Sequence, residues 1–150
     1  MTDLFQLSDN RLDAAIETAS RQLASKSLTK KSLFNEMERA FGAGSAEGAW
    51  SQRDAYDLLE AALTRHLQGS FASPRTEDIA AIGSLIEALP THTVRSEDQI
   101  RFQQFSTPAD LAALMVTLAQ ARSEDVVLEP SAGHGSLVAM LPPVRELHLN

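Results

Sequence analysis

Apolar residues recur at three- and four-residue spacing through the first 90 residues, in four stretches separated by polar or glycine-containing breaks. This spacing places them on one face of an α-helix, so each stretch predicts an amphipathic helix. The stripes that we expect to face a core are Leu12, Ile16, Ala19 and Leu23; Leu33, Phe34, Met37 and Phe41; Tyr56, Leu59, Leu63 and Leu67; and Ile79, Ile82, Ile86 and Leu89. Four short helices of this kind predict a small antiparallel bundle.

The expected helix boundaries come from residues that suit a helix end. Ser, Thr and Asp side chains accept hydrogen bonds from the free N–H groups of a first turn, and Gly or Pro often ends a helix. The residues predicted to cap the four helix starts are Ser8 or Asp9, Thr29, Ser51 together with Asp54, and Thr76. The predicted ends are Gly42, Gly69 and Pro90, and residues 42–48 are expected to form a flexible polar loop.

The pattern changes after residue 90. Residues 91–105 show no clear period and are interpreted as a connector. Thr107 and Pro108 then predict the N-cap and the first residue of a further helix, because Pro is favoured at that position. The side of this helix that we expect to be buried consists of Leu111, Leu114, Met115 and Leu118.

The end of the chain alternates between strand and helix signals. An apolar strand is predicted at 125–129, followed by a glycine-rich turn, a short helix and a second strand at 146–150. The predicted fold is therefore a mainly α-helical region over residues 1–90, followed over residues 106–150 by the start of an α/β domain. Parallel strands are normally covered on both faces, and two strands leave most of that surface uncovered. We therefore expect the α/β domain to be incomplete and the sequence to be cut from a longer protein.

Composition indicates which class of protein this is and where in the cell it is expected. The chain has 150 residues, of which 43% are hydrophobic and 22% charged, a composition typical of globular proteins. It has no cysteine and begins without a signal-peptide pattern, so we expect a cytoplasmic protein that is not inserted in a membrane. The net charge of −7 is unfavourable for contact with phosphates, so strong DNA binding is not expected of this chain by itself.

The glycine-rich turn carries the candidate chemistry. Gly133 and Gly135 are not followed by the Lys of a P-loop, and Val138 stands where a dinucleotide-binding fingerprint has its third Gly. S-adenosylmethionine has no phosphates, and its site requires close approach to the backbone and an acidic residue at the end of a strand. Glu129, Gly133 and Gly135 supply both features, so they predict an S-adenosylmethionine site.

Two motifs together resemble a known family. The segment Val126-Val127-Leu128-Glu129-Pro130-Ser131-Ala132-Gly133-His134-Gly135 resembles the first cofactor motif of class I methyltransferases. It is closest to the adenine-N6 DNA methylases, whose Phe-x-Thr-Pro motif is matched upstream by Phe105-Ser106-Thr107-Pro108. Over roughly residues 35–150 the chain also resembles the opening of bacterial strawberry notch-like proteins, in segments such as Ala46-Glu47-Gly48-Ala49-Trp50 and Leu89-Pro90-Thr91-His92-Thr93. In those proteins a methylase-like segment precedes a superfamily 2 helicase.

The resemblance implies a Rossmann-like domain with S-adenosyl-L-methionine as cofactor, and it assigns roles to several residues. Phe105, Thr107 and Pro108 would line the methionine end of the cofactor. The main pocket would consist of Glu129, Pro130, Ala132, Gly133 and Gly135. The catalytic Asn/Asp-Pro-Pro-aromatic motif is absent, so this chain by itself is expected to be inactive, and DNA would be contacted only through the rest of the full-length protein and its helicase region.

Other interpretations of the same residues remain open. The sequence is also compatible with a non-catalytic docking or nucleic-acid-presenting module of a helicase, and with a free-standing protein whose sheet edges an oligomer covers. The glycine-rich turn by itself is compatible with a structural β–α turn. The four histidines do not show a metal-binding spacing, and Trp50 and Tyr56 are expected to be packing residues.

Overall fold

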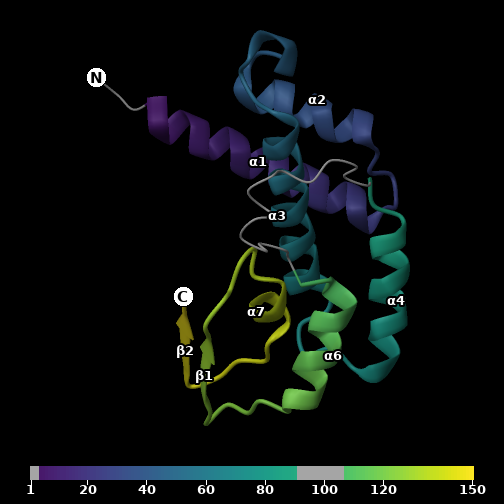
Figure 1. Cartoon of the computed structure of the whole chain (residues 1–150), viewed down its shortest axis with the longest axis vertical. Coiled ribbons are helices and arrows are strands. Elements are labelled where there is room, and N and C mark those ends of the chain that lie inside the picture. The colour runs from purple at the N-terminus through teal and green to yellow at the C-terminus, as the bar shows by residue number, and fades with distance from the viewer. Residues whose placement is uncertain (1–3, 91–106) are drawn as a thin grey trace, which may run out of the picture. The chain divides into compact units, whose positions relative to one another are not determined.

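The computed structural model describes residues 4–90 and 107–150, and the side chains from Asn10 onward within those ranges (Figure 1). In chain order the elements are α1 (Leu4–Ala24), α2 (Lys30–Phe41), the 3₁₀ turn η1 (Ser45–Glu47), α3 (Gln52–Ser70), α4 (Thr76–Glu87), α6 (Ala109–Ala119), β1 (Val126–Glu129), α7 (Ser136–Met140) and β2 (Glu146–Leu149). The described part of the chain is thus mainly helical with a small sheet, which confirms the prediction of a mainly helical region followed by strands.

The chain divides into two compact units, residues 1–66 and residues 67–150. The first unit contains α1, α2 and most of α3, and the second contains α4, α6, α7 and the two strands. The division differs from the predicted boundary at residue 90, because α4 packs against α6 and so belongs with the α/β part. The predicted grouping of α4 with the three preceding helices relied on helical periodicity, which does not identify packing partners.

The core of the first unit follows the predicted stripes. Its buried side chains are Ala15, Ala19, Leu23, Leu28, Leu33, Met37, Trp50, Ala55, Tyr56, Leu58, Leu59 and Ala62. Leu12 in α1 and Phe41 at the end of α2 depart from the prediction, because both side chains are exposed. The predicted N-cap at Ser8 or Asp9 is also wrong, since α1 begins at Leu4 and runs through both residues. Single Ser and Asp residues within a helix cost only a few tenths of a kcal/mol each, on the order of their helix propensity.

The caps of α2 and α3 form as predicted. Thr29 Oγ1 accepts a hydrogen bond from the Ser32 N–H at 3.1 Å, and Gly42 ends α2 with a left-handed φ of 75°. At the start of α3, the Ser51 N–H donates to the Asp54 carboxylate at 2.7 Å, and the Asp54 N–H donates to Ser51 Oγ at 3.3 Å. These reciprocal bonds satisfy donors that a helix start leaves free. α3 ends at Ser70, one residue beyond the predicted Gly69.

The segment between α2 and α3 is more ordered than the predicted flexible loop. It contains the 3₁₀ turn η1, which Gly48 ends with a left-handed φ of 76°. Trp50 is buried, donates its indole N–H to the Ala43 carbonyl at 2.9 Å and packs edge-on against Phe34 with ring centroids 5.2 Å apart. A buried indole with its N–H satisfied anchors the segment at both ends, which confirms Trp50 as a packing residue.

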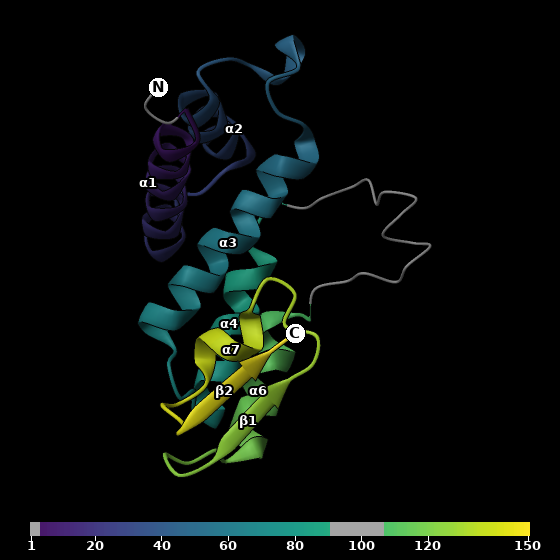
Figure 2. The ribbon, with the colours of Figure 1, turned by 90° about the vertical axis from the view of Figure 1, so that its left-hand side faces the viewer.

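In the second unit, β1 and β2 pair in parallel, with Val126 opposite Glu146 and Glu129 opposite Leu149. Figure 2 shows the sheet in front of α6 and α7, so both helices cover the same face. Among the described residues the other face has no covering layer, and Val126 and Leu128 on it are 49% and 66% exposed. This agrees with the expectation that a sheet of two strands leaves much of its surface uncovered.

The predicted buried side of α6 is also wrong. Leu111, Leu114, Met115 and Leu118 are exposed, and the buried side is formed by Ala109, Ala112, Ala113 and Val116. These small residues face α4 and α7, the two helices that α6 contacts, and they allow close approach of the helix backbones. The loop after α3 is held to the same group of helices, because Thr117 Oγ1 donates to the Pro74 carbonyl at 3.1 Å and the Ser73 N–H donates to the Met140 carbonyl at 2.9 Å.

The first turn of α4 begins one residue earlier than predicted. Arg75 occupies the N-cap position, and its backbone N–H donates to the Asp78 carboxylate at 2.8 Å. Thr76, predicted as the cap, is the first helical residue. Within α4, Ile82 is buried as predicted and Leu85 is buried in addition, while the helix ends at Glu87, before Pro90. None of the helices among the described residues is long and apolar enough to cross a membrane.

A pair of substitutions tests which face of α6 is buried. Ala113→Leu adds volume to a fully buried position and is expected to lower the free energy of unfolding by about 1–3 kcal/mol. Leu118→Ala, at a side chain that is 71% exposed, is expected to change it by less than about 0.5 kcal/mol. Urea unfolding followed by circular dichroism measures both values. A larger loss for Leu118→Ala than for Ala113→Leu would restore the face predicted from sequence.

A second stability prediction concerns His66 in α3. Burial lowers the pKa of His66 below its ordinary value of 6.5, because the charged imidazolium loses hydration. The unfolded chain then takes up this proton at higher pH than the folded chain, so the free energy of unfolding is expected to fall as the pH drops below about 6.5. His66→Gln removes this contribution and should flatten the dependence. The free energy of unfolding of the unsubstituted chain and of His66→Gln is measured at about pH 7.5 and 5.5. An equal decrease between the two pH values in both proteins would contradict the prediction.

Candidate functional site

The candidate site is the turn that connects the carboxyl end of β1 to α7. Gly133 and Gly135 both adopt left-handed backbone conformations, with φ of 52° and 84°. Gly135 is also the N-cap of α7, and its carbonyl accepts the first hydrogen bond of that helix, from the Ala139 N–H at 2.8 Å. Glycine adopts positive φ without the steric cost that a Cβ brings, so the backbone path by itself accounts for both glycines.

Glu129 is held at the end of the strand by the turn itself. Its carboxylate oxygen Oε1 accepts a hydrogen bond from the Ser131 N–H at 2.9 Å, and its side chain is half-buried. The bond directs the carboxylate toward the turn rather than along the exposed face of the sheet. An acidic group therefore lies at the start of the glycine turn, at the end of the strand, as the sequence predicts.

β2 fixes the turn from the other side through Asn150. The Asn150 N–H donates to the Glu129 carbonyl and the Ala132 N–H donates to the Asn150 carbonyl, each at 3.1 Å. The Asn150 side-chain amide also donates to the Pro130 carbonyl at 3.3 Å. Sequence reasoning missed Asn150 as part of the site. The signal that could have indicated it is an amide side chain directly after the apolar positions of a predicted second strand.

Space beside Gly133 is open among the described residues. Of their atoms, apart from those of its chain neighbours, a Cβ added to Gly133 would meet one within 4 Å, the Ser131 carbonyl oxygen at 3.9 Å. The backbone at this position is therefore accessible to a molecule in van der Waals contact. The geometry thus satisfies both interpretations of the glycine, a conformational requirement and a close approach of a ligand.

Three backbone donors of the turn bond within the chain. The N–H groups of Ser131, Ala132 and Gly135 donate to Glu129 Oε1, the Asn150 carbonyl and the Ala132 carbonyl. A phosphate site needs several N–H groups aimed at the anion, as in a P-loop or a nest. Because these three donors are satisfied within the chain, they are not available to hold a phosphate group.

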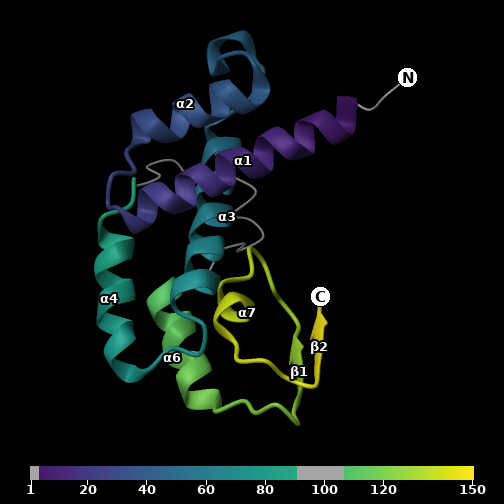
Figure 3. The same cartoon turned by 180° about the vertical axis from the view of Figure 1, so that it is seen from behind.

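The described residues of the upstream motif, Thr107 and Pro108, lie at the same end of the second unit. α6 and β1 run in opposite directions and are joined by a short connection, which brings the start of α6 to the level of the end of β1 (Figures 1 and 3). The prediction for this helix start is off by one residue: Pro108 is the N-cap, with its carbonyl accepting the Ala112 N–H at 2.9 Å, and Thr107 precedes it. A one-residue shift is the usual uncertainty at a helix end. Phe105 lies outside the described residues.

The remaining candidates do not add to the site. No group of three or more His, Asp or Glu side chains capable of holding a metal ion is found among the described residues. The predicted pocket residues Glu129, Pro130, Ala132, Gly133 and Gly135 share one turn, and Thr107 and Pro108 lie at its end of the unit. Comparison of the chain with protein-family models, with curated proteins and with solved structures gave no match. The family resemblance therefore stays a prediction.

The bond between Glu129 and Ser131 predicts how the turn responds to substitution. Glu129→Ala removes the acceptor of the Ser131 N–H, a loss of about 0.5–1.5 kcal/mol, so the exchange of that amide hydrogen should speed up by up to about tenfold. Glu129→Gln retains a carbonyl acceptor and should leave exchange close to that of the unsubstituted chain. Hydrogen exchange followed by NMR measures the difference. Equal exchange in both variants would show that the carboxylate does not hold the turn.

Proposed function

We propose that residues 107–150 form the front part of a pocket for S-adenosyl-L-methionine in a Rossmann-like class I methyltransferase domain. The observation that carries the proposal is the glycine turn at the carboxyl end of a parallel strand, with open space beside Gly133. Ligands of open α/β sheets bind outside the carboxyl ends of the strands. The N–H groups of Ser131, Ala132 and Gly135 bond within the chain, which supports a ligand such as this one that does not need them for phosphate contacts.

Each residue would have a defined part in holding the cofactor. Glu129 would accept hydrogen bonds from the amino group or the ribose hydroxyls, and the backbone at Gly133 and Gly135 would contact the ligand closely. Thr107 and Pro108 would lie toward its methionine end, together with Phe105. When bound, the cofactor supplies a methyl group activated by its sulfonium, and these residues bind and orient it.

The acceptor would be supplied by the rest of a longer protein. By its resemblance to the adenine-N6 methylases, the complete domain would act on an adenine amino group of DNA, which has to be flipped out of a duplex to reach such a site. DNA contacts and a superfamily 2 helicase region are part of the same proposal. This chain has no methylase catalytic motif, so we expect it to bind the cofactor without transferring its methyl group.

A second candidate function is favoured by the apolar surface of the second unit. The exposed side chains of α6 and of the open face of β1 are those of Leu111, Leu114, Met115, Leu118, Val126 and Leu128. Large apolar side chains exposed on two elements of one unit favour an interaction site. The second unit would in that case be a non-catalytic docking or nucleic-acid-presenting module of a helicase.

Cofactor binding is tested by titrating the chain with S-adenosylmethionine and recording backbone amide shifts by NMR. We expect changes at residues 129–135 and at Thr107, and no comparable changes with ATP. Gly133→Val should abolish them, because the side chain occupies the open space and strains a positive φ. Gly83→Val is the matched control, since Gly83 lies in α4 with nothing within 4 Å of an added Cβ.

A third variant separates the two roles of Gly133. Asn tolerates the left-handed conformation better than other residues with side chains, so Gly133→Asn keeps the turn while filling the space beside it. Loss of binding in Gly133→Asn supports a ligand at this position. Unchanged affinity in both Gly133→Val and Gly133→Asn would refute the proposed pocket.

A further inference from the structure

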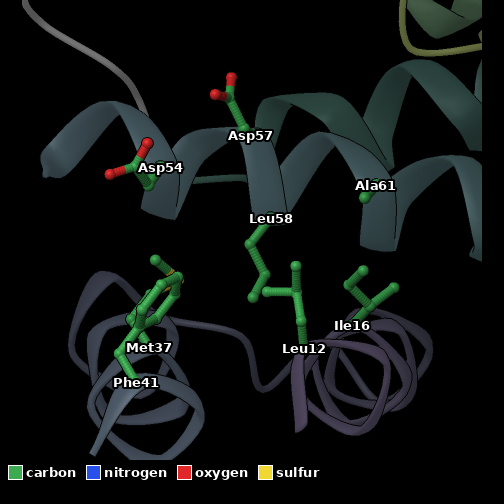
Figure 4. A pocket seen from close by; sticks show the side chains of 8 residues that line it. All are labelled: Leu12, Ile16, Met37, Phe41, Asp54, Asp57, Leu58 and Ala61. Carbon is green, nitrogen blue, oxygen red and sulfur yellow. The ribbon is translucent and has the colours of Figure 1, made fainter. Parts of the chain in front are cut away.

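A pocket opens among three helices of the first unit (Figure 4). Its volume is about 260 Å³. The apolar side chains that line it come from α1, α2 and α3, and they are Leu12, Ile16, Met37, Phe41, Leu58 and Ala61. The carboxylates of Asp54 and Asp57 on α3 complete the lining. We call this pocket the α1–α3 groove.

The floor and the mouth of the α1–α3 groove are both apolar. Met37 and Leu58 are 1% and 3% exposed and form its floor, whereas Leu12 and Phe41 are 36% and 46% exposed at its mouth. In Figure 4 Leu58 points toward Leu12 across the groove. Large apolar side chains left in contact with water around a concave apolar floor favour burial by another molecule.

The rim of the groove is acidic on the α3 side. In Figure 4 the carboxylates of Asp54 and Asp57 point away from the apolar side chains. Asp54 accepts hydrogen bonds from Ser51, and Asp57 has Arg53 Nε 4.0 Å from its Oδ2, with both of those side chains about half exposed. Two carboxylates beside an apolar groove favour a cationic group over an anionic one at this rim.

The size of the groove limits what it can accept. Pockets for whole small-molecule ligands measure roughly 300–1,000 Å³, while a single water needs about 30 Å³. The groove lies below the first range and well above the second. It suits one or two large apolar side chains presented by a peptide, rather than a complete cofactor.

We propose that the α1–α3 groove docks an amphipathic helix of a partner protein. The helix would insert apolar side chains between Leu12 and Phe41, and its flanking positions would place Lys or Arg beside Asp54 and Asp57. Helix-in-groove recognition uses apolar anchors one turn apart, which matches a groove with this lining. The site is independent of the proposed cofactor pocket, which lies in the other unit.

The probe for this site is a synthetic amphipathic helix with Leu on one face and Lys on the flanking positions, and its control is the same peptide with Glu in place of Lys. Binding to the full chain is measured by fluorescence anisotropy, and NMR identifies the amides that shift. We expect the Lys peptide to bind and to shift the groove residues. The Glu peptide should bind at least about tenfold more weakly, because several like charges then face the rim.

Two matched pairs of variants show whether the groove is the site. Ala61→Met fills the groove and should weaken binding by about tenfold or more, whereas Ala14→Met at an exposed position of α1 should not. Asp57→Asn should weaken binding about two- to fivefold, as for an exposed ion pair, and Asp13→Asn makes the same charge change outside the groove. Circular dichroism confirms that each variant is folded. Equal effects within either pair, or no binding of the Lys peptide, would overturn the proposal.

Discussion

The parallel pairing of β1 with β2 is the interaction on which the candidate site depends. It places Asn150 where its backbone bonds both the Glu129 carbonyl and the Ala132 N–H, and these bonds fix the path of the glycine turn. The left-handed conformations of Gly133 and Gly135 follow from that path, as does the position of the Glu129 carboxylate against the Ser131 N–H. A slip of one residue between the strands would reverse the faces of all these groups at once.

Local signals in the sequence predicted the structure well where a few neighbouring residues decide it. The caps at Thr29 and at Ser51 with Asp54, and the end of α2 at Gly42, involve bonds between residues three or four positions apart. The glycine turn was placed correctly for the same reason. Cap preferences and positive-φ preferences belong to single residues, so the sequence carries them directly.

The buried side of α6 was not predictable in that way. Its sequence is apolar nearly all round, so a leucine stripe and an alanine stripe both have helical spacing. Which stripe faces inward depends on α4 and α7, whose contact through Ala112, Ala113 and Val116 is long-range information. The grouping of α4 with the α/β part is another consequence of that contact. The contribution of Asn150 also depends on the pairing of β1 with β2. Periodicity in the sequence does not show which strands pair.

The distribution of charge links the two candidate sites. The arginines found within 4.0 Å of a carboxylate are Arg21, Arg39, Arg53, Arg65, Arg75 and Arg145. Cations paired in this way are less available for the phosphate contacts that dominate affinity for nucleic acid. The excess of acidic residues, with a net charge of −7, instead favours ligands that carry positive charge. A sulfonium cofactor beside Glu129 and a basic helix beside Asp57 both meet that condition, so the electrostatics of this chain suit binding a cationic cofactor and a cationic partner better than holding DNA.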